Sequence, residues 1–159
     1  MKKINDLLAA IGGNFQSLTL LVLRLAWGFQ LYESGVGHLT HIDKTVQFFE
    51  SLKFFGRYPM PLPTLNVYVS GATELAGGIL LMLGLLSRPI AVILFFNFCV
   101  AYVTAGWSEI SEIIHLHSPD DFINDAAFPF LLTSLIIFAF GPGKVALDSL
   151  FFKKSASGG

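Results

Sequence analysis

An unbroken apolar stretch, residues 65–86, constrains the fold of this chain more than any other feature. It has 22 residues and a single ionisable side chain, Glu74, near its middle. As an α-helix with a rise of ~1.5 Å per residue it is about 33 Å long, enough to cross the hydrocarbon core of a bilayer. It lacks the polar stripe that a soluble helix carries. The stretch therefore predicts a transmembrane helix.

Small residues surround the acid on one face of this predicted helix. Ser70, Gly71, Gly77 and Gly78 recur with Glu74 at helical spacing, which allows a neighbouring helix to approach closely. We therefore expect Glu74 to face protein and not lipid. An acid at the middle of a membrane costs about 2.5–3.5 kcal/mol on insertion scales, so it should have a partner and is a candidate functional group.

Composition agrees with a membrane protein. Only 13% of the residues are charged, against about 25% in soluble domains, and the mean hydropathy is +0.66. The length of 159 residues suits a single domain, which we expect to cover residues 1–154, with a disordered tail or expression remnant at 155–159. The net charge of −1 offers no basic surplus for a nucleic-acid partner. The single cysteine, Cys99, excludes an internal disulfide.

Three further apolar segments complete the prediction of an all-α, four-helix transmembrane bundle. Their bounds are 14–32, 89–106 and 126–141. The first contains Arg24, and Asn97 is the strongly polar side chain of the next. The last is short, so we expect it to begin earlier, near Phe122. Residues 45–55 have one apolar side and predict a short helix that lies along the membrane interface or over the mouth of the bundle.

Basic residues predict the orientation of the bundle. Of the nine Lys and Arg residues that flank the predicted spans, six lie on the side of both termini and three on the other side. The positive-inside rule then places both termini in the cytoplasm. The chain begins with Met1-Lys2-Lys3, as a signal peptide does, but no small-residue cleavage site follows, so we expect no removal.

Arg24, Glu74 and Asn97 are expected at one depth in the membrane. Arg24 lies ten residues and Glu74 nine residues into their spans from opposite faces, which puts both near the midplane of a ~30 Å core. Two unpaired charges there are costly, so we predict that Arg24 and Glu74 pair directly or through Asn97. Two roles stay open: an ion pair that sets the helix register, or a proton or redox-ligand site beside that pair.

A redox role for this chain requires a borrowed electron carrier, because no histidine lies inside a predicted span to ligate a haem. A lipid-soluble quinone is the simplest such carrier, and we expect it in a cleft in the extracytoplasmic half of the bundle. The candidates for its aromatic walls are Trp27, Trp107 and Phe128. The candidates for a hydrogen bond to its carbonyl oxygen are Arg24 and Tyr102, with Asn97 at a similar level. The candidates for proton transfer are Glu74 and Asp125.

Four histidines fall in the two extracytoplasmic loops, and they are weak candidates for a metal site. They are His38, His41, His115 and His117. With nearby carboxylates they offer ligands for a divalent metal. Their spacing matches no established metal signature, so we predict no bound metal.

Several short motifs follow one another in an order typical of a known family. They are Arg24-Leu25-x-x-Gly28, Glu74-x-x-Gly77-Gly78 with Arg88 in the turn beyond it, and Gly141-Pro142-Gly143 before Leu147-Asp148. With these motifs, residues 24–148 resemble the DoxX-like family of small four-helix bacterial membrane proteins. Members similar to this chain usually have Lys where His38 stands, so a fixed positive charge near that position would have to come from Lys44.

The resemblance implies a multi-pass protein of the bacterial cytoplasmic (inner) membrane. The family takes its name from a subunit of a thiosulfate:quinone oxidoreductase, and other members are tied to redox or thiol-stress systems. It therefore implies an integral membrane component of a redox system that is associated with a quinone. The alternative is a non-catalytic anchor or scaffold for a partner protein, and a homo-oligomer stays open.

Overall fold

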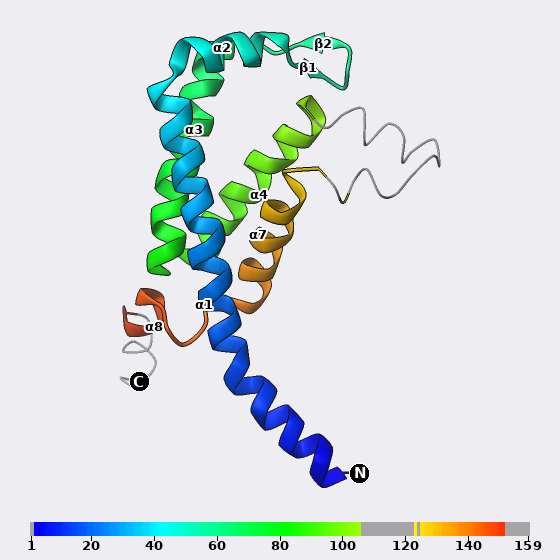
Figure 1. Ribbon diagram of the computed structural model, residues 1–159, viewed down its shortest axis with the longest axis vertical. Coiled ribbons are helices and arrows are strands. Elements are labelled where there is room, and N and C mark those ends of the chain that lie inside the picture. The colour runs from blue at the N-terminus through cyan, green and yellow to red at the C-terminus, as the bar shows by residue number, and fades with distance from the viewer. Residues whose placement is uncertain (1, 106–122, 124, 152–159) are drawn as a thin grey trace, which may run out of the picture.

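The computed structural model describes residues 2–105, 123 and 125–151, and within them the chain is nearly all helical (Figure 1). The helices are α1 (Lys2–Thr40), α2 (Ile42–Ser51), α3 (Pro63–Leu83), α4 (Ser87–Thr104), α7 (Phe128–Phe140) and α8 (Leu147–Phe151). Two short strands, β1 (Lys53–Phe54) and β2 (Tyr58–Pro59), pair in antiparallel fashion between α2 and α3. The core lies where α1, α3, α4 and α7 meet, and its buried members are Leu31, Leu81, Ala91, Leu94, Phe98 and Ile137.

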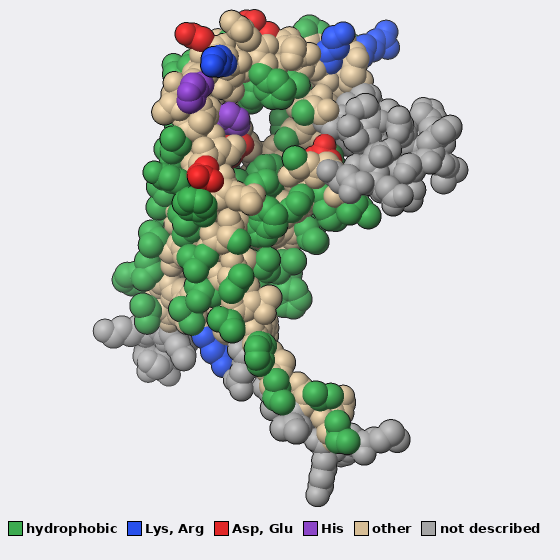
Figure 2. Space-filling view, viewed as in Figure 1, with side chains coloured by type: hydrophobic (Ala, Val, Ile, Leu, Met, Phe, Trp, Pro, Cys, Tyr) green, Lys and Arg blue, Asp and Glu red, His purple; other side chains and the backbone are tan. Residues whose placement is uncertain are grey.

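Within the described part of the chain, α1, α3 and α4 are long and apolar enough to cross a membrane. Hydrophobic side chains cover the flanks of these helices in the space-filling view (Figure 2). These features confirm the predicted all-α membrane bundle. Helix α7 is apolar but has only 13 residues, about 20 Å, so a fourth complete span stays a prediction.

Helices α1 and α3 run antiparallel and pack through facing glycines. An added Cβ at Gly35 would lie 2.7 Å from the carbonyl oxygen of Gly71, and one at Gly28 would lie 2.9 Å from that of Gly78. Backbone therefore touches backbone along this seam, which only residues without a side chain permit. The predicted close approach of a neighbouring helix on the small-residue face of α3 is confirmed.

The predicted bounds of the first span, 14–32, are wrong at both ends, because α1 is a single helix of 39 residues. Glycines at positions 35 and 37 predicted an exit from the helix, but Gly35 is used to pack against α3 and the helix continues to Thr40. At its start, α1 extends away from the bundle toward the N-terminus (Figure 1), and there Ile4 and Leu8 are exposed.

Helix α2 and the β1–β2 hairpin lie across one end of the bundle (Figure 1). The helix predicted at 45–55 is present but begins and ends earlier, because Leu52 turns to an extended conformation and the chain enters β1. Phe49 of α2 is buried against Met60 and Val67. The backbone N–H of Phe55 donates to the carbonyl of Val103 at 2.9 Å. Of the two placements predicted for this helix, the structure therefore shows the one over the mouth of the bundle.

Candidate functional site

Glu74, the acid in the middle of α3, is buried, and both of its carboxylate oxygens have polar partners. The hydroxyl of Ser34 donates to Oε2 at 2.7 Å, and Nδ1 of His38 lies 3.3 Å from the same oxygen. The hydroxyl of Ser70 and the amide of Asn97 donate to Oε1 at 3.1 Å and 3.3 Å. Hydrogen bonds of this kind offset the desolvation of a carboxylate that is only 5% exposed. We call these five residues the Glu74 cluster.

The cluster follows from helical spacing on two neighbouring helices. Ser34 and His38 stand one turn apart on α1, and Ser70 and Glu74 stand one turn apart on α3, so each pair points in one direction. Gly71 makes room for this meeting, because an added Cβ there would lie 3.1 Å from the Cβ of His38. Asn97 completes the cluster from α4, and its predicted level beside Glu74 is confirmed.

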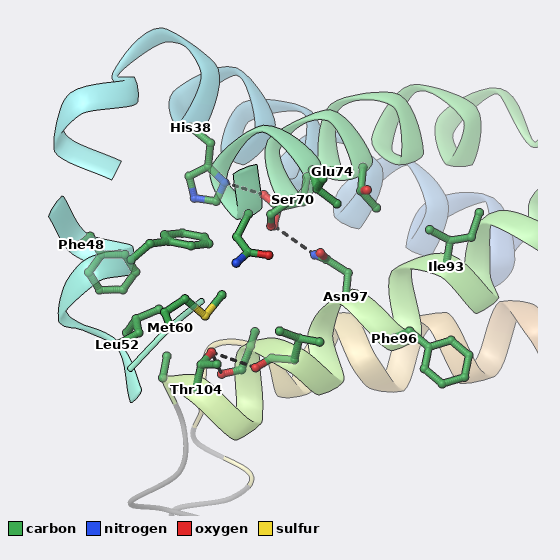
Figure 3. Close-up of a pocket in the computed structure, with 17 residues that line it drawn as sticks. His38, Phe48, Leu52, Met60, Ser70, Glu74, Ile93, Phe96, Asn97 and Thr104 are labelled. Carbon is green, nitrogen blue, oxygen red and sulfur yellow. Dashed lines mark hydrogen bonds and ion pairs between the residues drawn. The ribbon is translucent and has the colours of Figure 1, made fainter. Parts of the chain in front are cut away.

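A cavity of about 370 Å³ opens beside the cluster, between α2, α3 and α4 (Figure 3). We call it the Glu74 pocket. His38, Ser70, Glu74 and Asn97 lie together in its wall, and Asn66, Thr73 and Thr104 are further polar lining residues. The rest of the lining is apolar and includes Phe48, Phe49, Leu52, Met60, Ile93, Phe96 and Val100. In Figure 2 the molecule is hollowed below α2, next to histidine and acidic side chains.

The pocket combines features typical of sites for small organic ligands. Its volume falls within the range of roughly 300–1,000 Å³ for such sites, and its walls are largely apolar with a few convergent polar groups. The polar groups comprise a carboxylate, an imidazole and an amide, which together accept, donate and transfer protons. The arrangement therefore suits a flat apolar ligand that carries an oxygen able to exchange a proton.

Arg24 lies elsewhere, and the predicted Arg24–Glu74 pair is wrong. The antiparallel register that places Gly35 against Gly71 brings Arg24 level with Gly84, at the far end of α3. There the guanidinium is 1% exposed and donates from Nη2 to the carbonyl oxygen of Val145. Its other two nitrogens, Nε and Nη1, have no acceptor among the described residues. The midplane estimate failed because α1 continues beyond Tyr32 to Thr40, so that its segment from Gly28 to Gly35, and not the turn around Arg24, packs against the middle of α3.

The other side chains that were predicted to contact a quinone do not line the Glu74 pocket, or they belong to residues that the structure does not describe. Of the described residues, Trp27 packs edge-on against Phe130, with ring centroids 5.1 Å apart, and does not line the Glu74 pocket. Tyr102 is buried in α4 away from the pocket lining. Asp125 accepts a hydrogen bond from the backbone N–H of Ala127 at 2.6 Å, at the start of α7. Phe128 also begins α7, and Trp107 lies outside the described residues.

Sequence reasoning missed the roles of His38 and Ser34 as partners of Glu74. His38 was placed in a loop because the first span was ended at Tyr32, whereas α1 continues past it. The signal was present, since Ser34 and His38 have the i, i+4 spacing of one helix face. His41 is exposed, and its Nδ1 lies 3.0 Å from the hydroxyl of Thr40. Among the described residues no three metal-ligating side chains come together, and His115 and His117 fall outside them.

Comparison with known proteins places the chain in a family. The DoxX family model matches residues 19–107, which is more than half of the chain. The chain belongs to the DoxX family. A relative from Bacillus subtilis (strain 168), named "Putative oxidoreductase CatD", is 30% identical over 140 residues, covering 87% of this chain and 90% of the relative. No solved structure matches the chain.

The segment matched by the DoxX family model includes the whole Glu74 pocket. Its lining residues all fall between positions 38 and 105, inside the matched range 19–107. Val145 and Asp148, which lie near Arg24, fall outside that range. In this DoxX chain the pocket therefore belongs to the part that defines the family, and the surroundings of Arg24 include a segment beyond it.

Proposed function

We propose that this DoxX-family chain is a membrane component of a redox system and that it binds a lipid-soluble quinone in the Glu74 pocket. The observation that carries the proposal is the placement of a buried, hydrogen-bonded carboxylate, with other polar side chains beside it, in the wall of a largely apolar cavity of about 370 Å³. The name of the Bacillus relative, "Putative oxidoreductase CatD", supports the redox class.

Each wall of the pocket has a task in this proposal. The rings of Phe48 and Phe49, which stand edge to face with centroids 6.0 Å apart, offer a surface for a planar head group. The side-chain amide of Asn97 has two N–H groups, of which one is used by Glu74, so the second can bind a carbonyl oxygen. Bound quinone would supply the electron chemistry, in which uptake of electrons is accompanied by protons.

Glu74 and His38 hold the proton in this scheme. Glu74 and His38 both line the pocket, and Nδ1 of His38, in the last turn of α1, lies 3.3 Å from Oε2 of Glu74. Carboxylates and imidazoles are both common general acids and bases, so this pair offers two groups that can exchange a proton with a bound ligand. The electrons come from or go to a partner protein. In such an assembly this chain also serves as the membrane anchor of that partner.

We further propose that the pocket occupies the extracytoplasmic half of a bundle with four spans, in the bacterial cytoplasmic membrane. The six-to-three distribution of flanking Lys and Arg residues supports this orientation. Single cysteines at the exposed positions Asn5 and Ser51, in a chain with Cys99→Ala, test it with an impermeant thiol reagent on intact cells. Labelling at Ser51→Cys alone is expected, and labelling at Asn5→Cys alone would reverse the orientation.

Quinone binding is tested by titrating ubiquinone and menaquinone analogues into the detergent-purified protein. The His38→Gln and Glu74→Gln variants should each bind about tenfold more weakly or worse, because a hydrogen bond to a charged group contributes about 1.5–3 kcal/mol. His41→Gln is the matched control, since His41 is exposed and lies three residues from His38 outside the pocket lining.

A second pair of variants covers the case in which the cluster variants fail to fold. Phe48 lines the pocket and is 53% exposed, whereas Phe138 on α7 is 51% exposed and does not line it. Phe48→Ala should weaken binding and Phe138→Ala should not. If the wild type shows no saturable binding, or if Phe48→Ala binds as tightly as Phe138→Ala, the quinone proposal is wrong and a non-catalytic anchor becomes the better description.

A further inference from the structure

A second and larger cavity lies at the opposite end of the bundle, beside the turn that joins α3 and α4. Its volume is about 870 Å³. Three parts of the chain enclose it: residues 13–20 of α1, residues 86–89 at the start of α4, and residues 140–150, which run from the end of α7 into α8. Nothing in the Glu74 cluster contributes to it, so it requires its own explanation.

Both apolar and polar side chains line the cavity. The apolar lining residues include Leu20, Leu86, Pro89, Phe140 and Leu150. Leu86, Phe140 and Leu150 are 46%, 63% and 69% exposed, so apolar surface at the cavity is left uncovered by the described part of the chain. The lining also includes side chains able to bind an anion: Gln16, Ser17, Arg88 and Lys144.

The charge balance of the described lining residues is positive. Arg88 lies along the Gly141 wall, where an added Cβ would be 3.5 Å from its Nη2. Lys144 is held in place by its backbone N–H, which donates to the hydroxyl of Ser17 at 3.3 Å. Asp148 is the acidic residue among the described lining, and its two oxygens accept hydrogen bonds from the N–H groups of Leu86 and Ser87, both at 2.8 Å. Its charge is therefore engaged by the start of α4, and the two cations remain available.

We propose that this cavity binds the phosphodiester head group of an anionic phospholipid. Arg88 and Lys144 bind the phosphate, and the acyl chains leave across Phe140 and Leu150. Arginine suits this task because its planar guanidinium donates two parallel hydrogen bonds to phosphate oxygens. The exposed apolar surface of Phe140 and Leu150 favours a lipid over free phosphate, because inorganic phosphate has no apolar part that could pack against it. Basic cavities between transmembrane helices bind anionic head groups in this manner.

The test uses the detergent-purified full chain and native mass spectrometry with added lipids. Phosphatidylglycerol should be retained at lower concentrations than phosphatidylcholine, whose head group carries no net charge. Removing one cation near a lipid head group weakens binding about fivefold, so Arg88→Gln with Lys144→Gln should weaken retention of phosphatidylglycerol about 25-fold. The matched control is Lys44→Gln with Arg57→Gln. It removes two exposed basic residues from α2 and the β1–β2 turn, at the opposite end of the bundle.

Each outcome decides the proposal. Loss of phosphatidylglycerol in the Arg88/Lys144 variant, with retention in the Lys44/Arg57 variant, supports it. Equal retention of the two lipids, or equal losses in the two variants, overturns it. Competition by inorganic phosphate at the same concentrations as the lipid would show a free-anion site in place of a lipid site. Both Arg88 and Lys144 are exposed, so their substitution is expected to leave the fold intact.

Discussion

Substituting Gly35 by alanine should separate α1 from α3 and disturb the Glu74 cluster with it. An added Cβ would lie 2.7 Å from the carbonyl oxygen of Gly71 and 2.8 Å from the Cα of Leu75. Both are backbone atoms of α3, so no side-chain rotation relieves the clash and the helices must move apart. Overpacking of this kind lowers the free energy of unfolding by about 1–3 kcal/mol.

Gly37 is the control for this substitution, because it lies two residues further along α1 and an added Cβ there meets nothing within 4 Å. Both variants gain the same helix propensity, up to about 1 kcal/mol, so their difference isolates the clash. Unfolding by increasing denaturing detergent in mixed micelles measures that difference. Since Ser34 neighbours Gly35, ligand binding in the Glu74 pocket should also weaken in Gly35→Ala. If Gly35→Ala is as stable as Gly37→Ala, the close α1–α3 seam described above is incorrect.

Two further predictions concern the start of α4 and the separation of Arg24 from Glu74. Asp148→Ala removes the acceptor for the N–H groups of Leu86 and Ser87 at the start of α4. As with the loss of a helix cap, the substitution should lower the free energy of unfolding by about 0.5–2 kcal/mol. An unchanged unfolding midpoint would contradict this capping role. Arg24→Leu and Glu74→Leu should be additive to within about 0.5 kcal/mol in a double-mutant cycle, because the two residues share no partner, whereas a larger coupling energy would restore the direct pair.

The features of the fold that the sequence did not predict are mainly the length of α1 and its register against α3. Apolar stretches of membrane-spanning length predicted α3 and α4 to within a few residues of their ends, and the small-residue stripe predicted that a neighbouring helix approaches α3 closely. Local sequence did not predict that α1 continues to Thr40, because a glycine that breaks an isolated helix is the residue that a packed helix uses for close contact. The β1–β2 hairpin was missed as well, since two-residue strands carry almost no pattern.

For the site, the sequence by itself determined that Glu74 lies in a membrane helix, faces protein and needs polar partners, since an isolated carboxylate is costly in a low-dielectric interior. It also placed Asn97 at a similar level, by its distance along the next span, and the structure brings the two side chains together. Only the tertiary structure decided that His38 and not Arg24 meets Glu74. That choice depends on the register of α1 against α3, which is set by glycines that interlock at Gly28 and Gly35. Counting residues from an assumed membrane surface cannot supply that register, because each residue of sliding moves a side chain by ~1.5 Å and turns it by about 100°.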